Sequence, residues 1–437
     1  MNLPALFKRG ERSYPAVDGI RAIAVIWVIL FHAWLFQSYE IPEPRNWSPD
    51  TVAAATALSQ DIYHWPVLNW VTKGDLAVDL FFVISGFLIG GQLFQQQKDA
   101  GRLDFGGFYK RRIRRLIPAY VVAMLLALYF MDGKNVERAW SNLLYINNYV
   151  RDSYIGWTWS LAIEEQFYLV VPLLVGFLFP LFRRKRWVFV VIFLIPILLK
   201  WHHLTGEQGF RLPFDVAFFT PEWGDWFWEY YMYTHLRYNG LLLGVFAAYL
   251  HVHRRTVIQH FIAGRVGSIN LLVAGCVATI VIIANIPTGQ WVVLEDSFFR
   301  SLPASVGRAY ECLHREVFCM ATAGLILASI HAQGWIEPVR RFLGHRCFFP
   351  VAQVSYSAYL LHEMFMFWGF PKMKALFAGH IGEVWLAFLN TSLVLVITLG
   401  GAAVIFLLVE EPILRRRPGG PKVSQKSVGR SGAGEQN

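Results

Sequence analysis

The chain has 437 residues, of which 55% are hydrophobic and only 16% are charged, and its formal net charge is +10. Charged residues average about 25% in soluble domains, so this composition excludes an ordinary water-soluble protein and predicts a polytopic membrane protein. The positive charge requires no nucleic-acid partner, because basic loops facing an anionic lipid leaflet account for it.

Apolar segments that are long enough to cross a bilayer, or nearly so, recur along the whole chain. They lie at about 17–36, 74–94, 116–131, 159–182, 187–200, 236–251, 268–286, 316–332, 351–370 and 384–408. We therefore predict an all-α membrane bundle of about ten transmembrane helices. The third and fifth segments are short, and a tilted, broken or re-entrant segment is the alternative for each.

Lysine and arginine are concentrated in alternate loops, and this asymmetry predicts that both termini lie in the cytoplasm. We expect a multi-pass protein of the cell inner membrane. The first apolar run lacks a small-residue cleavage site, so we interpret it as a retained signal anchor. Residues 1–416 are predicted to form the membrane domain and residues 417–437 a disordered cytoplasmic tail. The four cysteines fall at different predicted depths, and neither a disulfide nor a metal site is predicted.

The first predicted span carries two ionisable side chains, Arg21 and His32, on one helical face. Eleven residues return almost to the same azimuth, so the two groups are stacked about 16 Å apart along the axis. Ionisable groups at membrane depth are costly and mark a functional interior by default. A core histidine that bonds a neighbouring carbonyl is the alternative for His32 taken alone.

Other polar residues fall near the predicted depth of His32, in the outer half of their spans. Asp79 lies in the second span, Glu164 and Glu165 in the fourth, and His362 in the ninth. Consecutive spans are usually neighbours, so a contact between His32 and Asp79 is geometrically feasible. A histidine with several carboxylates suffices for acid–base chemistry on a hydroxyl. Each residue also has a structural alternative, such as contact with lipid headgroups or with a backbone carbonyl.

A basic cluster precedes the third span on the predicted inner side. It contains Lys110, Arg111, Arg112, Arg114 and Arg115. Arg112 and Arg115 share a helical face, and arginine pairs at this spacing bind phosphate oxygens well. A plain topology anchor is the alternative interpretation. A phosphate-bearing donor held inside and an acid–base site near the outside suggest a group passed across the membrane.

A long predicted outer loop at 201–235 is rich in aromatic and acidic residues. An interfacial belt of Trp and Tyr is the favoured interpretation, and a sugar-stacking platform facing the periplasm is the alternative.

These residues together make the chain resemble the acyltransferase-3 family of integral membrane acyltransferases, which modify bacterial surface glycans. The resemblance covers residues 14–416. It is carried by Arg21-x10-His32, Asp79-Leu-Phe-Phe-Val-Ile-Ser85-Gly86-Phe87, Arg111-Arg112-x-x-Arg115-Leu-x-Pro118, Trp159-Ser160-Leu-x-x-Glu164-Glu165-Gln166-Phe167-Tyr168, Ser355-Tyr356-Ser357-x-Tyr359-Leu-x-His362 and Glu411-Pro412. One such element would be weak evidence, whereas all of them in order are highly specific.

The resemblance implies transfer of an acyl group, most often acetyl, from cytoplasmic acyl-CoA to a hydroxyl of an extracytoplasmic glycan or glycolipid. His32 would be the catalytic residue, either as general base or as transient acyl acceptor. Asp79 or Glu164 would fix its tautomer. Arg21 would line the donor channel or stabilise the thioester oxygen. No permanently bound cofactor is implied.

In the family's basic motif, Arg112 and Arg115 would hold the donor's phosphates, with Arg111 or Arg114 assisting. Some relatives carry a fused periplasmic hydrolase-like domain after the last span, whereas this chain stops about twenty residues beyond it. Transfer is then expected to be completed by the membrane domain alone or by a separate periplasmic partner.

Two other classes compete with the enzyme. A transporter of a glycolipid or small anion would line its path with the same charges, but transporters usually show an internal repeat, and none is visible in the sequence. A sensor or scaffold without catalysis is the third class. The joint presence of Arg21, His32, the basic motif and Glu164 argues against it.

Overall fold

The computed structural model describes residues 3–9, 14–38, 70–178, 185, 187–206, 227–286, 304–377 and 379–415. These residues form helices joined by short connections, and no strand is present among them. The ten long helices are α1 (Pro15–Ser38), α3 (Leu76–Ala100), α4 (Phe105–Phe130), α6 (Trp159–Leu173), α8 (Trp187–Gly206), α12 (Asn239–His253), α14 (Val266–Asn285), α16 (Ala304–His331), α18 (Phe348–Phe377) and α19 (Glu383–Ile405). Each coincides with one predicted apolar segment, which confirms the all-α class.

Eight of the described helices are long and apolar enough to cross a membrane. The two predicted spans outside this group are α12, which has only 15 residues, and α18, which has 30 residues but buries Ser, His and Glu side chains. The third segment is longer than expected, because α4 runs unbroken through the basic cluster and past Pro118. Residues 207–226 of the aromatic loop and the tail 417–437 lie outside the described residues.

The shorter elements connect these helices or extend them. They are η1 (Leu3–Leu6), η4 (Val71–Lys73), η5 (Val136–Arg138), α5 (Ala139–Leu143), η6 (Asn147–Tyr149), η7 (Gly156–Thr158), η8 (Leu174–Leu178), η9 (Phe227–Tyr231), α11 (Thr234–Arg237), α13 (Arg255–Ile262), α17 (Ile336–Leu343), η11 (Phe406–Glu410) and α20 (Glu411–Arg415). Three of them, η8, η9 and η11, are π-helical, and two of these prolong α6 and α19.

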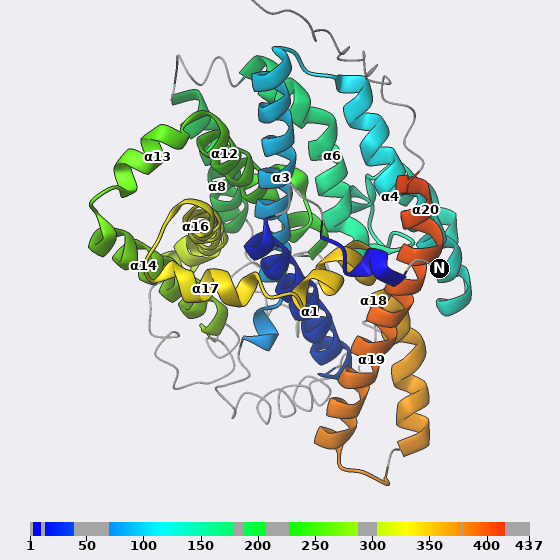
Figure 1. Ribbon diagram of the computed structural model, residues 1–437. Coiled ribbons are helices and arrows are strands. Elements are labelled where there is room, and N and C mark those ends of the chain that lie inside the picture. Colours follow the sequence, from blue (N-terminus) through cyan, green and yellow to red (C-terminus); the bar gives the residue numbers. More distant parts are fainter. Residues whose placement is uncertain are drawn as a thin grey trace, which may run out of the picture.

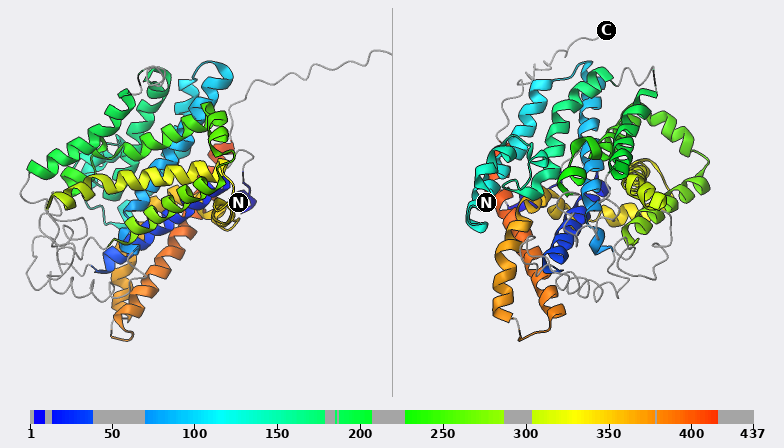
Figure 2. Two further views of the ribbon diagram at one scale, coloured as in Figure 1. Left: turned by 90° about the vertical axis from the view of Figure 1, so that its left-hand side faces the viewer. Right: turned by 180° about the vertical axis from the view of Figure 1, so that it is seen from behind.

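Helix α1 lies in the middle of the bundle (Figures 1 and 2) and contacts α3, α16, α17, α18 and α19. On one side are α8, α12, α14 and α16, and on the other are α4, α6 and the α18–α19 hairpin, whose far end extends beyond its neighbours. At the other end of the bundle η1 packs against α18 and η11. The first described element therefore lies beside η11, the element that precedes α20.

A tight turn joins α3 to α4. Gly101 ends α3 in the left-handed conformation, with φ at 67°, which glycine adopts without strain. Asp104 begins α4 by accepting a hydrogen bond from the Gly107 amide at 2.8 Å. Two helices joined by so short a connection are antiparallel, so the start of α4 faces the end of α3. Arg112 accordingly donates to the Gln92 side chain at 3.3 Å.

The closest helix pair, α3 and α12, is held together by glycines. A Cβ at Gly86 would collide with the Leu241 carbonyl, and one at Gly244 would collide with the Val83 carbonyl. Small residues let backbones approach in membrane bundles, where packing replaces the hydrophobic effect as the driving force. The close approach brings the start of α3 against α11, which places Asp79 beside Arg237.

Candidate active site

The structure places Arg21 and His32 on α1 as the sequence predicts, with eleven residues and about 16 Å of helix between them. Arg21 lines a cavity, whereas His32 lies beyond it toward the C-terminal end of α1. The side chain of His32 is 18% exposed, so it is not sealed inside the bundle. The two residues therefore lie in different parts of the bundle, Arg21 on the cavity and His32 outside it.

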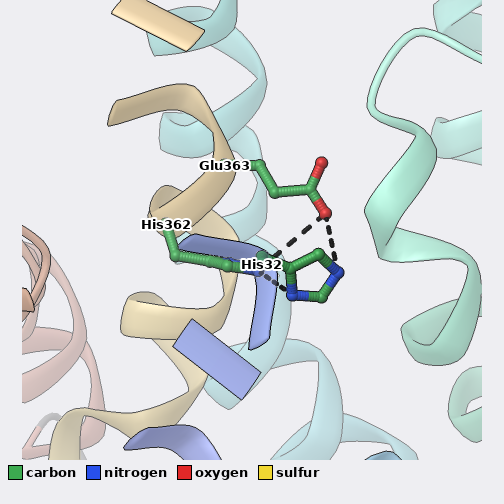
Figure 3. Close-up of side chains that lie close together, drawn as sticks. All are labelled: His32, His362 and Glu363. Atoms are coloured by element: carbon green, nitrogen blue, oxygen red, sulfur yellow. Dashed lines mark hydrogen bonds and ion pairs between the residues drawn. The ribbon is translucent and has the colours of Figure 1, made fainter. Parts of the chain in front are cut away.

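His32 belongs to a cluster with two consecutive residues of α18, His362 and Glu363 (Figure 3). Its Nε2 atom lies 3.2 Å from Oε1 of Glu363, and its Nδ1 atom lies 3.2 Å from Nε2 of His362. His362 is fully buried, and the Glu363 side chain is 11% exposed. His32 thus contacts His362, which was predicted only to lie at a similar depth, and the carboxylate beside it is Glu363.

The backbone contacts of the cluster assign the hydrogens. A carbonyl oxygen only accepts, so Nδ1 of His362 donates to the Tyr359 carbonyl at 2.6 Å. Nε2 of neutral His362 is then an acceptor. The hydrogen therefore lies on Nδ1 of His32, which shares it between the Val28 carbonyl, 2.9 Å away, and Nε2 of His362. The lone pair of neutral His32 is consequently on Nε2, so its 3.2 Å contact with Glu363 becomes a hydrogen bond when the pair holds a proton, either on Nε2 or on the carboxyl group.

The same three side chains are of types that bind metals. Their nitrogen and carboxylate oxygen atoms lie within 4.8 Å of one another. Two imidazoles and one carboxylate at this spacing are able to hold a divalent ion such as Zn²⁺. No metal is expected from the sequence, and the absence of a metal stays a prediction.

A cavity opens between α1, α3, α4, α6 and α18, and four of the predicted site residues line it: Arg21, Arg112, Arg115 and Glu164. It encloses about 810 Å³ of space, including a part open to solvent. The polar and charged residues that line it are Arg21, Ser85, Gln92, Arg112, Arg115, Ser160, Glu164, Tyr168, Ser355, Tyr356 and Tyr359. Along α3 it extends from Val78 to Gln92, which is about 21 Å of helix.

Arginines mark one end of this cavity. Arg112 and Arg115 both line it, together with Gln92, while Arg111 and Arg114 are not among its lining residues. The guanidinium of Arg112 also lies 5.8 Å from the ring centre of Tyr168. The structure therefore divides the basic motif into two cavity-facing arginines and two that face elsewhere.

Glu164 lies in the middle of the cavity and not beside His32. It accepts hydrogen bonds from Ser85 at 2.9 Å and from Tyr168 at 3.0 Å. Arg21 lines the same space. A carboxylate held by two hydroxyls and facing an arginine is an element of the cavity wall, and it does not orient the imidazole of His32.

Asp79 does not contact His32, although the two lie on consecutive predicted spans. It lies 3.2 Å from Arg237 and 2.7 Å from Arg315, and Arg315 pairs in addition with Asp75. All four side chains are buried. Within the described part of the chain Asp79 thus belongs to a buried four-residue ion cluster, and the carboxylate in contact with His32 is Glu363.

Tyr359 separates the cavity from the histidine cluster. Its hydroxyl donates to the Trp157 carbonyl at 2.7 Å and is therefore the acceptor for Ser160, also at 2.7 Å. Its ring lies 5.3 Å from the ring of His362. Because Ser160 and Tyr359 both line the cavity, their hydrogen bond marks the end nearest His32.

Sequence reasoning missed Glu363, Arg237 and Arg315. Glu363 directly follows His362, so one further residue of the same motif would have included it. Arg237 and Arg315 fall at the edges of predicted spans, where arginine usually marks topology. Only the packing of α11 and α16 against α3 reveals their partners.

The sequence of the chain is similar to those of several known proteins. Residues 14–407 match the acyltransferase-3 family model, which describes an acyltransferase domain. The chain is 30% identical to O-acetyltransferase OatA of Staphylococcus aureus over 234 residues, which cover 46% of this chain and 33% of OatA. It is 22% identical to "Nose resistant to fluoxetine protein 6" of Caenorhabditis elegans over 409 residues, 82% of this chain and 46% of that protein.

The matched region spans less than half the length of each of these two curated relatives. No solved structure matches the chain. The family model covers nearly all of the membrane bundle, including the cavity, the histidine cluster and the two cavity-facing arginines, Arg112 and Arg115. The chain therefore belongs to the acyltransferase-3 family.

Proposed function

We propose that this protein is an O-acyltransferase of the cell inner membrane that moves an acyl group, most simply acetyl, from cytoplasmic acyl-CoA to a hydroxyl of an extracytoplasmic glycan or glycolipid. The observation that carries the proposal is one cavity with arginines at one end and the His32 cluster just beyond the other. Both termini are placed in the cytoplasm, as the distribution of basic residues predicts.

The donor end is the end that holds Arg112 and Arg115. Guanidinium groups bind phosphate oxygens in forked geometry, and coenzyme A carries three phosphate groups. The cavity runs about 21 Å along α3 in all, and its part beyond the arginines would hold the extended pantetheine arm. Arg21 and Glu164 would line the path of that arm, and about 16 Å of helix separates Arg21 from His32, where the thioester reacts.

The reaction end is the His32 cluster. Nε2 of His32 takes the proton of the acceptor hydroxyl as its oxygen attacks the thioester carbonyl. The carbon–sulfur bond breaks, CoA leaves as the thiolate, and the proton ends on that sulfur, so the products are an ester and CoA. Transient acylation of the same Nε2 followed by transfer to the hydroxyl is the alternative that stays open.

Glu363 and His362 act through His32. The hydrogen on Nδ1 of His32 is held by the Val28 carbonyl and by Nε2 of His362, which fixes the tautomer that exposes Nε2. The Glu363 carboxylate, 3.2 Å from Nε2, stabilises the imidazolium that forms when the proton arrives. We assign both as positioning residues for His32.

Reconstitution tests the proposal directly. Purified protein in sealed proteoliposomes receives radiolabelled acetyl-CoA on one face and glycan acceptors on the other, and both free CoA and acetylated glycan are measured. We expect CoA on the side of Arg112 and acetylated product on the side of His32. A protein that binds acetyl-CoA yet releases no CoA with any acceptor, while the His32→Ala variant behaves identically, contradicts the proposal.

A further inference from the structure

An aromatic cluster lies one helical turn beyond the two residues that form the reaction end. Phe36 follows His32 by four residues on α1, and Phe367 follows Glu363 by four residues on α18. Residues four apart lie on one helical face, about 6 Å along the axis. The two rings meet edge to face with their centres 4.6 Å apart. The two rings therefore lie on the same helical faces as His32 and Glu363, one turn nearer the C-terminal ends of α1 and α18.

Trp157 completes this cluster from the opposite side. Its ring lies 6.3 Å from that of Phe367, and its Nε1 donates to the Leu360 carbonyl at 3.2 Å. Phe367 is thus flanked by α1 on one side and by η7, the entry to α6, on the other. Part of the Phe367 ring is therefore packed against other elements of the bundle.

Phe367 is nevertheless 45% exposed, although Trp157 beside it is buried. His32 and Glu363 are also partly exposed, and neither lines the donor cavity. The base, its carboxylate and the aromatic ring are therefore all partly exposed, and none of the three lines the cavity that holds the arginines.

A polar group adjoins the aromatic rings. Gln37 follows Phe36 and donates through Nε2 to the Ala33 carbonyl at 2.7 Å and to Thr391 at 3.0 Å. Its Oε1 atom is buried and has no hydrogen-bond partner among the described residues. A carboxamide oxygen is an acceptor that a ligand hydroxyl would satisfy.

We propose that Phe36, Trp157 and Phe367 form the subsite that binds the acceptor through one face of a pyranose ring. This inference rests on the proposed function, since it supplies the second substrate to the same Nε2. One face of a pyranose ring is made of C–H groups, which pack favourably against the electron-rich face of an aromatic ring. A sugar stacked on Phe367 presents its hydroxyls to His32 one turn away and to Gln37.

The test compares cyclic with acyclic acceptors. Purified protein transfers radiolabelled acetyl from acetyl-CoA to methyl α-D-glucopyranoside, to methyl N-acetylglucosaminide or to the open-chain polyol sorbitol. We expect wild-type protein to prefer both pyranosides over sorbitol. In Phe367→Ala the KM for the pyranosides should rise about tenfold or more, while the KM for sorbitol and for acetyl-CoA stays unchanged.

Three further variants serve as controls for the effect of Phe367→Ala on the KM of the pyranosides. Trp368→Ala removes the next residue of α18, whose ring contacts Phe130 at 5.7 Å and Lys372 at 3.6 Å, and it should leave acceptor KM values unchanged. Phe367→Trp should retain the pyranoside preference. Phe367→Leu, which preserves packing against Phe36, should lose the preference even if the alanine variant folds poorly.

The outcomes separate the two proposals. Wild-type protein that shows no preference for the pyranosides, or Phe367→Ala and Phe367→Leu variants with unchanged pyranoside KM, overturns the subsite while the acyltransferase assignment stands. Absence of CoA release by wild-type protein with every acceptor overturns the proposed function and the subsite together.

Discussion

Replacing Glu363 with glutamine examines whether Nε2 is the reacting nitrogen of His32. The substitution keeps the size of the side chain but removes the charge 3.2 Å from Nε2. A hydrogen bond to a charged group contributes about 1.5–3 kcal/mol, so kcat should fall about 10- to 150-fold. The new amide also donates to the lone pair of Nε2 and competes with the acceptor hydroxyl. The KM for acetyl-CoA should not change, because Glu363 is outside the donor cavity.

The assay is steady-state release of CoA by purified protein, with thermal unfolding measured on the same samples. Asp79→Asn is the matched control, since it removes a carboxylate of similar predicted depth whose partners are Arg237 and Arg315. Removing one partner of a buried ion pair costs about 3–5 kcal/mol, so this variant should lose stability before it loses kcat. A Glu363→Gln protein with normal folding and a kcat within threefold of wild type would refute the assignment of Nε2.

Four further predictions concern the remaining parts of the site. His32→Ala should insert normally and lose transfer by about 10²-fold or more, and near wild-type acylation at matched protein levels would contradict its role. Arg112→Ala and Arg115→Ala should weaken acetyl-CoA binding measured by titration, whereas Arg111→Ala, outside the cavity, serves as the control that should not. The exposed thiol of Cys347 should react with an impermeant maleimide only after spheroplast lysis, and labelling of intact spheroplasts would reverse the topology. Treatment with EDTA should leave activity unchanged and added Zn²⁺ should inhibit through the histidine cluster, so loss of activity on chelation would disprove the metal-free prediction.

The fold was predictable because the bilayer imposes a simple rule on sequence. Every spanning segment must satisfy its backbone internally and present apolar side chains to lipid, so long apolar runs become helices. This rule located all ten long helices, including α4 and α8, which the sequence showed as short segments. It does not specify where α4 begins, because the basic turns before Leu116 look like a loop by hydropathy and are helical in the structure.

The site was predictable only where its residues share one helix. Arg21 and His32 lie on α1, and Arg112 and Arg115 lie on α4, so periodicity alone placed each pair on one face. The partner of His32 was not predictable, because it depends on which helices pack against α1. Consecutive spans suggested Asp79 of α3, but α1 also packs against α18, and Glu363 of α18 reaches the imidazole.

Asp79 and Glu363 show why depth alone does not assign a role to a buried carboxylate. Asp79 faces two buried arginines, so its charge is neutralised and its oxygens are occupied. Glu363 faces an imidazole that can gain or lose a proton, and its side chain remains partly exposed. A carboxylate fixed between permanent cations stabilises packing, whereas one paired with a titratable group can respond to proton transfer. The partner across the helix interface, more than the residue or its depth, therefore separates the structural carboxylate from the one placed to assist His32.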